Sequence, residues 1–190
     1  MVRNLRSDPL DEGLVDRLVD LARRAPSAGN TQALDFLVLD TPADVERYWD
    51  TTLPEPGRSR FRWAGLLRAP VLVIVTVRPQ SYVERYSEAD KLHSGLGDDV
   101  GQWPVPYWWV DAGAASQNLL LAAVDAGLGA CLFGLFEHES GVATVFGVPA
   151  DRRLVATIAL GWPVDDPDEP GRSAARPRRP LSGVIHRGHW

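Results

Sequence analysis

The chain has 190 residues, 45% of them hydrophobic, and a formal net charge of −5. This length supports one sizeable core. The composition excludes a disordered chain and bulk nucleic-acid binding, and no run reaches the ~18 apolar residues that span a bilayer. The single cysteine, Cys131, excludes an internal disulfide and a cysteine-rich metal site. No basic-then-apolar leader opens the sequence, so we expect a cytoplasmic protein with no metal, nucleic-acid or membrane partner.

Periodicity in the first half predicts two helices and two strands. Leucines three and four residues apart indicate an amphipathic helix that Pro26 ends. Thr41 followed by Pro42 is typical of a helix start, and an unbroken β-branched run indicates a central strand. In chain order we expect a helix at 10–25, a strand at 36–39, a helix at 42–52 and a strand at 70–77.

The second half opens with a long segment that has no clear period, residues 78–106. A loop of that length inside a domain is unusual and often functional. The helix that follows is almost free of charge after Asp111, and a helix that is apolar all round is expected to be buried. The remaining elements are a helix at 110–126, a strand at 130–136, a short helix at 138–146 and a strand at 153–160.

This mixture of elements predicts an α+β sandwich, with a central, mostly antiparallel sheet flanked by helices. No G-x-G-x-x-G motif follows the first strand, which argues against a dinucleotide-binding fold. Residues 1–163 are expected to form a single domain. Residues 164–190 are rich in Pro, Arg and Gly and have no core of their own, so this tail is ordered only where it docks on another surface.

Three segments carry most of the functional information. The first, Arg24-Ala25-Pro26-Ser27-Ala28-Gly29-Asn30-Thr31-Gln32, can bring backbone and short polar groups close to a flat polar ligand. Taken alone, such a segment is more often a plain turn. The second starts at Asp111, continues with Gln117-Asn118-Leu119 and ends in Gly127-Leu128-Gly129. The third is Phe146-Gly147-Val148-Pro149 followed by Ala159-Leu160-Gly161-Trp162-Pro163.

In this order, the three segments resemble the FMN-dependent nitroreductase family, over roughly residues 2–181. The resemblance implies a nitroreductase-like sandwich and an intertwined homodimer, with FMN at the interface and the tail docking on the partner subunit. It also implies that NAD(P)H reduces FMN, and that hydride then passes from FMN N5 to a small electrophilic acceptor in a ping-pong reaction. Hydride transfer needs no side-chain acid or base, so no catalytic side chain is expected.

The resemblance also implies which residues bind the cofactor. Arg3, Arg176 and Arg178 are assigned to the phosphate. The leading arginine and serine of the family's N-terminal motif are absent, which implies either an upstream start or weaker phosphate binding. Assigned to the ring are Pro26, Ser27, Ala28 and Asn30, with Gln32 also matched, and Leu132, Phe133 and Gly134 near N5. Asp111 lies on the interface helix. The alternatives are a solvated basic tail for the arginines and helix capping for Asp111.

Tryptophans near the end of the long segment are candidates for the acceptor site, because aromatic faces stack on flat molecules. They are Trp103, Trp108 and Trp109. The alternative is that they fill the core or an interface. The histidines show no metal-ligand spacing, and Cys131 is expected to be a small core residue.

The sequence therefore predicts an FMN-dependent NAD(P)H oxidoreductase that reduces a nitroaromatic, quinone or enone. Two alternatives stay open. One is a relative that fragments its reduced flavin with oxygen or dehalogenates an aromatic substrate. The other is a non-catalytic flavin-binding or sensor protein, which the shortened N-terminal segment favours slightly.

Overall fold

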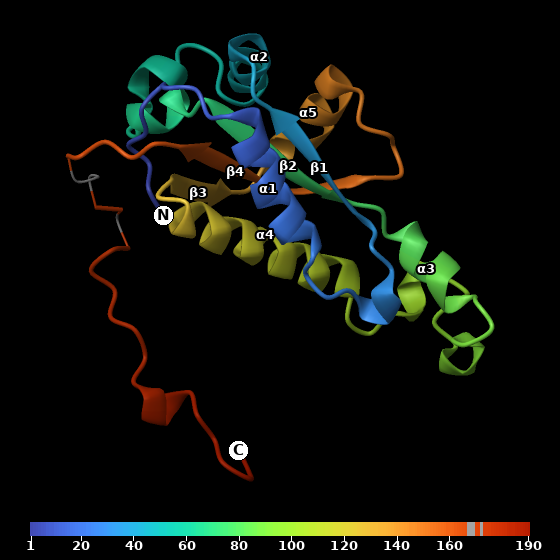
Figure 1. The fold of residues 1–190 in the computed structure, drawn as a ribbon. Coiled ribbons are helices and arrows are strands. Elements are labelled where there is room, and N and C mark those ends of the chain that lie inside the picture. The colour runs from blue at the N-terminus through green and yellow to red at the C-terminus, as the bar shows by residue number, and fades with distance from the viewer. Residues whose placement is uncertain (167–169, 172) are drawn as a thin grey trace.

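An antiparallel sheet of four strands organises the part of the chain that the structure describes (Figure 1). The computed structural model covers residues 1–166, 170–171 and 173–190, so 167–169 and 172 of the predicted tail lie outside the described residues. The strand order is β1, β2, β4, β3, and each neighbouring pair is antiparallel. The strands are β1 (Leu34–Leu39), β2 (Val71–Val77), β3 (Gly129–Phe133) and β4 (Arg153–Gly161). The predicted α+β fold is confirmed.

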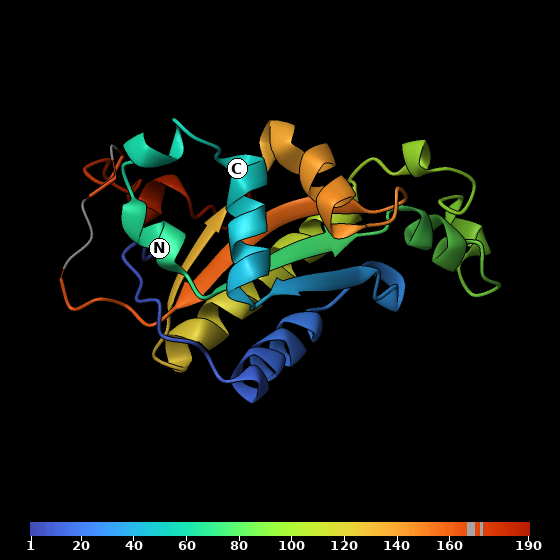
Figure 2. The ribbon, with the colours of Figure 1, turned by 90° about the horizontal axis from the view of Figure 1, so that it is seen from above.

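Helices cover both faces of this sheet (Figures 1 and 2). α1 and α4 pack together on one face, α2 and α5 lie on the other, and α3 stands beyond one end of the sheet. In the described residues, no helix is both long and apolar enough to cross a membrane. The helices are α1 (Glu12–Arg23), α2 (Pro42–Thr52), α3 (Gln80–Tyr86), α4 (Tyr107–Asp125) and α5 (Glu139–Phe146).

The two layers follow from the side-chain period of a strand, which is two residues. In β2, Val73 and Val75 pack among the buried residues of α1 and α4. Leu72 and Ile74 point the other way and pack with the buried residues of α2. Every residue of β2 is buried, as its continuous apolar sequence predicts.

Local signals set several helix ends as predicted. The Asp11 carboxylate accepts the Leu14 N–H at 3.1 Å and caps α1. Thr41 caps α2 in the same way, with Pro42 in the first turn. After α4 the chain turns at Gly127, whose φ of 76° suits a residue without a side chain.

Three expectations about boundaries are wrong. Segment 78–106 was expected to be irregular, yet α3 forms within it. This helix has seven residues, too few to show a period in the sequence, and burial of Tyr82 and Val83 stabilises it. α4 begins three residues earlier than the predicted range, directly after Pro106. The strand expected at 130–136 ends at Phe133, because the chain leaves the sheet before Phe136, whose φ is 49°.

The N-terminal segment lies beside β3. Val2 donates its N–H to the Ala130 carbonyl at 2.9 Å, and Leu5 forms an isolated antiparallel bridge with Pro163. These contacts fix Arg3 close to the edge strand. From residue 173 onward the tail runs away from the body of the molecule (Figure 1).

Candidate functional site

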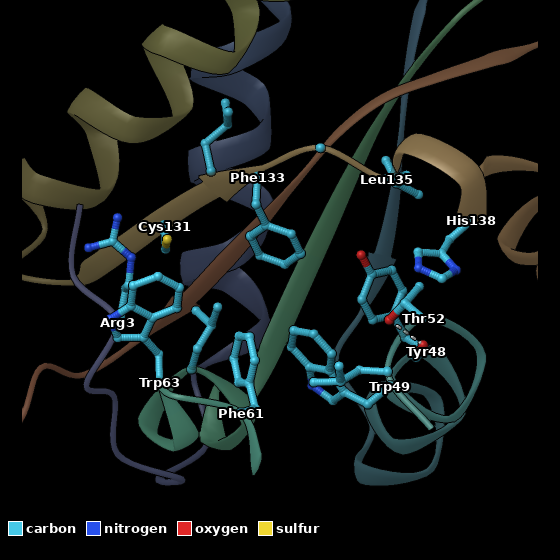
Figure 3. Close-up of a pocket in the computed structure, with 14 residues that line it drawn as sticks. Arg3, Tyr48, Trp49, Thr52, Phe61, Trp63, Cys131, Phe133, Leu135 and His138 are labelled. Atoms are coloured by element: carbon cyan, nitrogen blue, oxygen red, sulfur yellow. Dashed lines mark hydrogen bonds between the residues drawn. The ribbon is translucent and has the colours of Figure 1, made fainter. Parts of the chain in front are cut away.

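A cavity of about 340 Å³ lies on the α2 face of the sheet (Figure 3), and we call it the Arg3 cavity. Its walls come from the N-terminal segment, α2, the turn before β2, and β3 with the loop that follows. It therefore brings together two groups that the sequence predicted separately, Arg3 and Leu132–Gly134. The other lining residues are Tyr48, Trp49, Thr52, Leu53, Phe61, Trp63, Leu66, Cys131, Leu135 and His138.

Aromatic rings form much of the wall of the Arg3 cavity. The rings of Trp49 and Phe133 are stacked, with centroids 5.9 Å apart and an interplanar angle of 17°. Phe61 and Trp63 meet edge to face at 5.9 Å. Pockets with such walls and few polar groups suit a planar ligand.

The polar groups of the Arg3 cavity are few and placed at its ends. The Arg3 guanidinium lies 5.0 Å from the centre of the Trp63 ring at one end (Figure 3). Among the described residues, the buried indole N–H groups of Trp49 and Trp63 have no acceptor. A buried donor without an acceptor costs about 1–3 kcal/mol.

Tyr48 lies at the opposite end of the cavity from Arg3, near His138 (Figure 3). Its hydroxyl lies 2.8 Å from the Thr157 hydroxyl in the core. Burial raises the pKa of Tyr48 to about 12, although its hydrogen bonds to Thr157 and Thr52 act the other way. The phenol is therefore neutral at physiological pH.

The other predicted ring-binding segment, residues 26–32, lies at the N-terminal end of α4. Gly29, Asn30 and Gln32 all have positive φ values, of 63°, 56° and 53°. For a residue other than glycine this conformation costs about 1–3 kcal/mol. The Ser27 hydroxyl accepts the Gln32 N–H at 3.1 Å, which helps to offset that cost. Pro26, Asn30 and Gln32 remain exposed.

Asp111 holds this segment from inside the protein. Its Oδ2 atom accepts the Ala28 N–H at 2.9 Å and the Tyr82 hydroxyl at 2.7 Å. Burial, and then the bond to Asp111, raise the pKa of Tyr82 well above its usual range. Helix capping by Asp111 is wrong, because α4 begins before it at Tyr107. Direct contact between Asp111 and FMN stays a prediction, and the observed contact is with the segment.

A second anchor comes from α3. Arg85 donates its Nε–H to the Gly29 carbonyl at 2.8 Å and pairs with Asp90 through both terminal nitrogens, each at 2.8 Å. The bond from Arg85 is the main cause that lowers the pKa of Asp90 to about 2. Segment 26–32 is therefore attached to α3 on one side and to α4 on the other.

The three predicted acceptor-site tryptophans divide into two kinds. Trp103 and Trp108 are buried, and both meet Tyr82 edge to face, at 5.7 and 5.9 Å. This burial favours the packing alternative, although Trp103 also lines a hollow of about 450 Å³ beside Ala28. Trp109 is 37% exposed, and its ring centre lies 5.4 Å from the Arg153 guanidinium.

The predicted residues thus form two separate half-sites. Segment 26–32 lies at the N-terminal end of α4, whereas Arg3 lies beside β3, near the C-terminal end of that helix (Figure 1). A helix of 19 residues is about 28 Å long. The Arg3 cavity also opens on the sheet face opposite α4. One chain therefore does not bring both half-sites to the same small ligand.

The tail arginines touch neither half-site. Arg176 and Arg178 are exposed, in the part of the tail that runs away from the body (Figure 1). Their assignment to the phosphate stays a prediction, and any role requires the tail to dock on another surface. In the described residues, no group of three or more His, Cys, Asp and Glu side chains gathers as metal ligands would.

Sequence reasoning missed several residues of both half-sites. Trp49, Trp63 and His138 line the Arg3 cavity, and Tyr82 and Arg85 support segment 26–32. Trp49 lies on a predicted helix and could have been read as an ordinary core residue. Tyr82 and Arg85 lie in the segment without a period, where no local signal indicates burial.

Comparison with known proteins identifies the family. The chain matches the sequence profile of the Nitroreductase family over residues 1–162, and it belongs to that family. It is 29% identical over 178 residues to a 5,6-dimethylbenzimidazole synthase of Rhodospirillum rubrum, covering 87% of this chain and 78% of the relative. It is 25% identical over 181 residues to an NADH dehydrogenase of Thermus thermophilus, covering 87% and 83%.

Solved structures show the same fold at low identity. An FMN-dependent nitroreductase from Clostridium difficile superposes with a TM-score of 0.68 at 16% identity, covering 100% of this chain and 94% of that one. At that identity the likeness concerns the fold. Relatives of this chain thus carry oxidoreductase names, and one structural neighbour is named for FMN.

Proposed function

We propose that this chain is an FMN-dependent NAD(P)H oxidoreductase that acts as a homodimer and reduces a nitroaromatic, quinone or enone. The observation that carries the proposal is the Arg3 cavity, which joins Arg3 to Leu132–Gly134 in a chain of the Nitroreductase family. When bound, FMN supplies the redox chemistry by accepting a hydride from NAD(P)H and passing it to the acceptor in a ping-pong cycle.

The residues present fit FMN. The aromatic side chains of Trp49, Phe133 and Trp63 line the Arg3 cavity, and aromatic faces stack on a flat ring. Arg3 at one end supplies positive charge for a phosphate. Leu132–Gly134 line the cavity at the end of β3.

A dimer would unite the two half-sites. The outward face of α4 carries an apolar stripe in which Val110 is 51%, Leu121 59% and Val124 67% exposed. At Gly113 on that stripe an added Cβ would meet nothing within 4 Å, which leaves room for close approach of another helix. The expectation that this helix is buried all round is wrong for one chain, and a partner would cover the exposed face.

Two-fold symmetry gives the pairing a direction. If α4 packs antiparallel on its copy, the N-terminal end of one helix lies beside the C-terminal end of the other. Segment 26–32 of one subunit then approaches the β3 edge of its partner, along which the N-terminal segment with Arg3 lies. In this arrangement Asp111 and Tyr82 would position the segment. Hydride transfer itself would need no side-chain acid or base, and the proton that completes reduction of the acceptor would come from solvent.

The first test is an FMN titration of the purified protein, followed by absorbance at ~450 nm, the region where oxidised flavins absorb. Arg3→Gln should weaken FMN binding about 10- to 100-fold, because it removes one charge-assisted contact worth about 1.5–3 kcal/mol. Arg17→Gln, an exposed arginine on α1 with the same change of charge, is the control. FMN binding that is equal in both variants would contradict the proposed phosphate position.

The second test breaks the dimer. Leu121→Glu should give a monomer in sedimentation experiments and should abolish FMN retention, since half of each site would be lost. A stable obligate interface buries on the order of 2,000 Å² or more, so one charge at its centre has a large effect. Wild-type protein that sediments as a monomer at micromolar concentration would contradict the proposal.

A second candidate function is flavin fragmentation by oxygen. The match to a 5,6-dimethylbenzimidazole synthase at 29% identity means that family membership alone does not set the reaction. Incubation of the protein with reduced FMN in air, without an acceptor, distinguishes the two. Loss of FMN would favour fragmentation, whereas intact FMN and NAD(P)H oxidation with a quinone would favour the oxidoreductase. FMN binding without turnover would favour the non-catalytic sensor.

A further inference from the structure

Phe136 is an exposed aromatic residue in an unusual position. It is 83% exposed, and its φ of 49° lies in the left-handed region, which bulky residues rarely adopt. It directly follows the loop that closes the Arg3 cavity at Gly134 and Leu135. Neither its exposure nor its backbone conformation is explained by core packing.

The ring of Phe136 folds back over Gly134. A Cβ atom added at Gly134 would lie 3.1 Å from Cζ and 3.2 Å from Cε2 of Phe136, closer than most side chains tolerate. The absence of a side chain at Gly134 therefore allows the ring to lie against the backbone there. The strained backbone and the small neighbour together hold one aromatic face in the solvent beside the cavity.

Phe136 also lies beside arginines that are paired with carboxylates. It lines a hollow of about 400 Å³ together with Glu139 and Arg153, which pair through two contacts of 2.7 and 3.0 Å. The Trp109 ring lies against the same Arg153 guanidinium. Arg152 and Glu137 line the same hollow. Arg152 pairs with Asp35 and Arg153 pairs with Glu139, so both arginines of the hollow are paired, and the Phe136 ring is its stacking face.

We propose that Phe136 forms one wall of the acceptor site and selects uncharged, planar acceptors such as quinones and nitroaromatics. This inference rests on the proposed function, in which Gly134 lies near the reactive part of FMN. The molecule that occupies this acceptor site is small and flat, and it stacks on the exposed ring of Phe136. A partner subunit covering Phe136 is the competing explanation, and the experiment separates the two.

The experiment uses the FMN-reconstituted protein and a matched pair of redox-inert probes, 2-naphthol and its saturated analogue decahydro-2-naphthol. Wild type should bind the aromatic probe more tightly, measured by the change that it causes in flavin absorbance. Phe136→Leu keeps apolar bulk and removes the aromatic face, so it should reduce this preference about 3- to 10-fold. Phe136→Ala should reduce it at least as much. Val145→Ala, an exposed apolar residue on neighbouring α5, is the control and should leave the preference unchanged.

A second readout is turnover. The ratio of kcat/KM for a naphthoquinone to that for ferricyanide, which takes electrons without stacking, should fall by a similar factor in both Phe136 variants. FMN affinity and sedimentation should match wild type. Unchanged probe preference and turnover ratio would overturn the inference, as would weaker dimerisation with unchanged preference, which would make Phe136 an interface residue. Wild type that binds no FMN would overturn the proposed function and this inference with it.

Discussion

The hydroxyl of Tyr82 donates a hydrogen bond of 2.7 Å to the same carboxylate oxygen of Asp111 that accepts the Ala28 N–H. Both side chains are buried, with 0% of Tyr82 and 5% of Asp111 exposed. Trp103 and Trp108 surround the Tyr82 ring. This contact joins the aromatic cluster around Tyr82 to segment 26–32, which is expected to contact FMN. A substitution in the cluster should therefore alter the position of the segment.

The first prediction removes that hydroxyl. Tyr82→Phe leaves the buried Asp111 carboxylate with one donor fewer, and a hydrogen bond to a charged group contributes about 1.5–3 kcal/mol. We expect the free energy of unfolding to fall by about that amount in urea denaturation, and FMN affinity to fall up to about tenfold. Ser116→Ala is the control, because its buried hydroxyl donates to the Ala112 carbonyl within α4 itself and does not contact segment 26–32 in the described part of the chain. Equal FMN affinity in Tyr82→Phe and wild type would show that Asp111 holds the segment without Tyr82.

The second prediction concerns alkaline pH. Burial raises the pKa of Tyr48 to about 12, whereas a tyrosine in an unfolded chain ionises near pH 10. Between these values the folded state binds the extra proton, so stability is complete below about pH 10 and falls as pH rises toward about 12. Tyr48 contributes up to about 1.4 kcal/mol per pH unit to this slope, and Tyr82, whose pKa is also raised, adds to it. Unfolding measured by urea at several alkaline pH values should show this loss in wild type.

Tyr48→Phe provides the test of that assignment. It should lower stability at neutral pH, because the Thr157 hydroxyl loses its partner, but it should also reduce the slope above pH ~10. The difference in tyrosinate absorbance between wild type and this variant reports ionisation of Tyr48. This difference should appear only near pH ~12 or on unfolding. A difference signal that titrates near pH ~10 would contradict burial of Tyr48.

Most of the fold could be predicted from the sequence because its helices and strands carry strong local signals. The continuous apolar run of β2 and the Thr41-Pro42 start of α2 both lie where the pattern places them. α3 was missed because seven residues are too few for a period, and what holds them is tertiary burial of Tyr82. Such burial depends on Trp103 and Trp108, which lie some twenty residues further along the chain, and local patterns do not report it.

The candidate site could be predicted only in part, because local patterns do not report which side chains the fold brings together. Arg3 and Leu132–Gly134 were assigned through the resemblance, and the fold brings them into one cavity. The walls contributed by Trp49 and Trp63 look like ordinary core residues in the sequence. The left-handed backbone at Phe136 has no sequence signal either, since phenylalanine is a poor candidate for that conformation.

The third prediction separates the two neighbouring tryptophans. Trp108 is 8% exposed and packs on Tyr82, so Trp108→Ala should lower the free energy of unfolding by about 3–5 kcal/mol. Trp109→Ala should unfold like wild type within about 1 kcal/mol, retain FMN and alter acceptor preference, because its ring is partly exposed beside Arg153. Unfolding is measured by urea, and preference by relative kcat/KM for quinone, nitroaromatic and enone acceptors. If Trp109→Ala keeps the wild-type preference, Trp109 is not an acceptor-site residue.

The fourth prediction tests the tail. Arg176 and Arg178 are exposed and belong to a tail that runs away from the body of the molecule, so they can bind the FMN phosphate only if the tail docks on a partner. Each charge-assisted contact contributes about 1.5–3 kcal/mol, so Arg176→Gln and Arg178→Gln should each weaken FMN binding about 10- to 100-fold. Deletion of residues 172–190, which removes both, should abolish FMN retention and weaken the dimer in sedimentation experiments.

Arg187→Gln is the matched control for the tail, since it makes the same change of charge nine residues beyond Arg178. A solvated basic tail would attract the phosphate only through long-range charge, which salt screens within about 10 Å at 0.1 M. In that case all three arginine variants would weaken FMN binding slightly and equally, and the effect would vanish at high salt. A bound phosphate predicts losses confined to Arg176 and Arg178 that persist in salt. FMN titrations at two salt concentrations therefore decide between a docked tail and a solvated one.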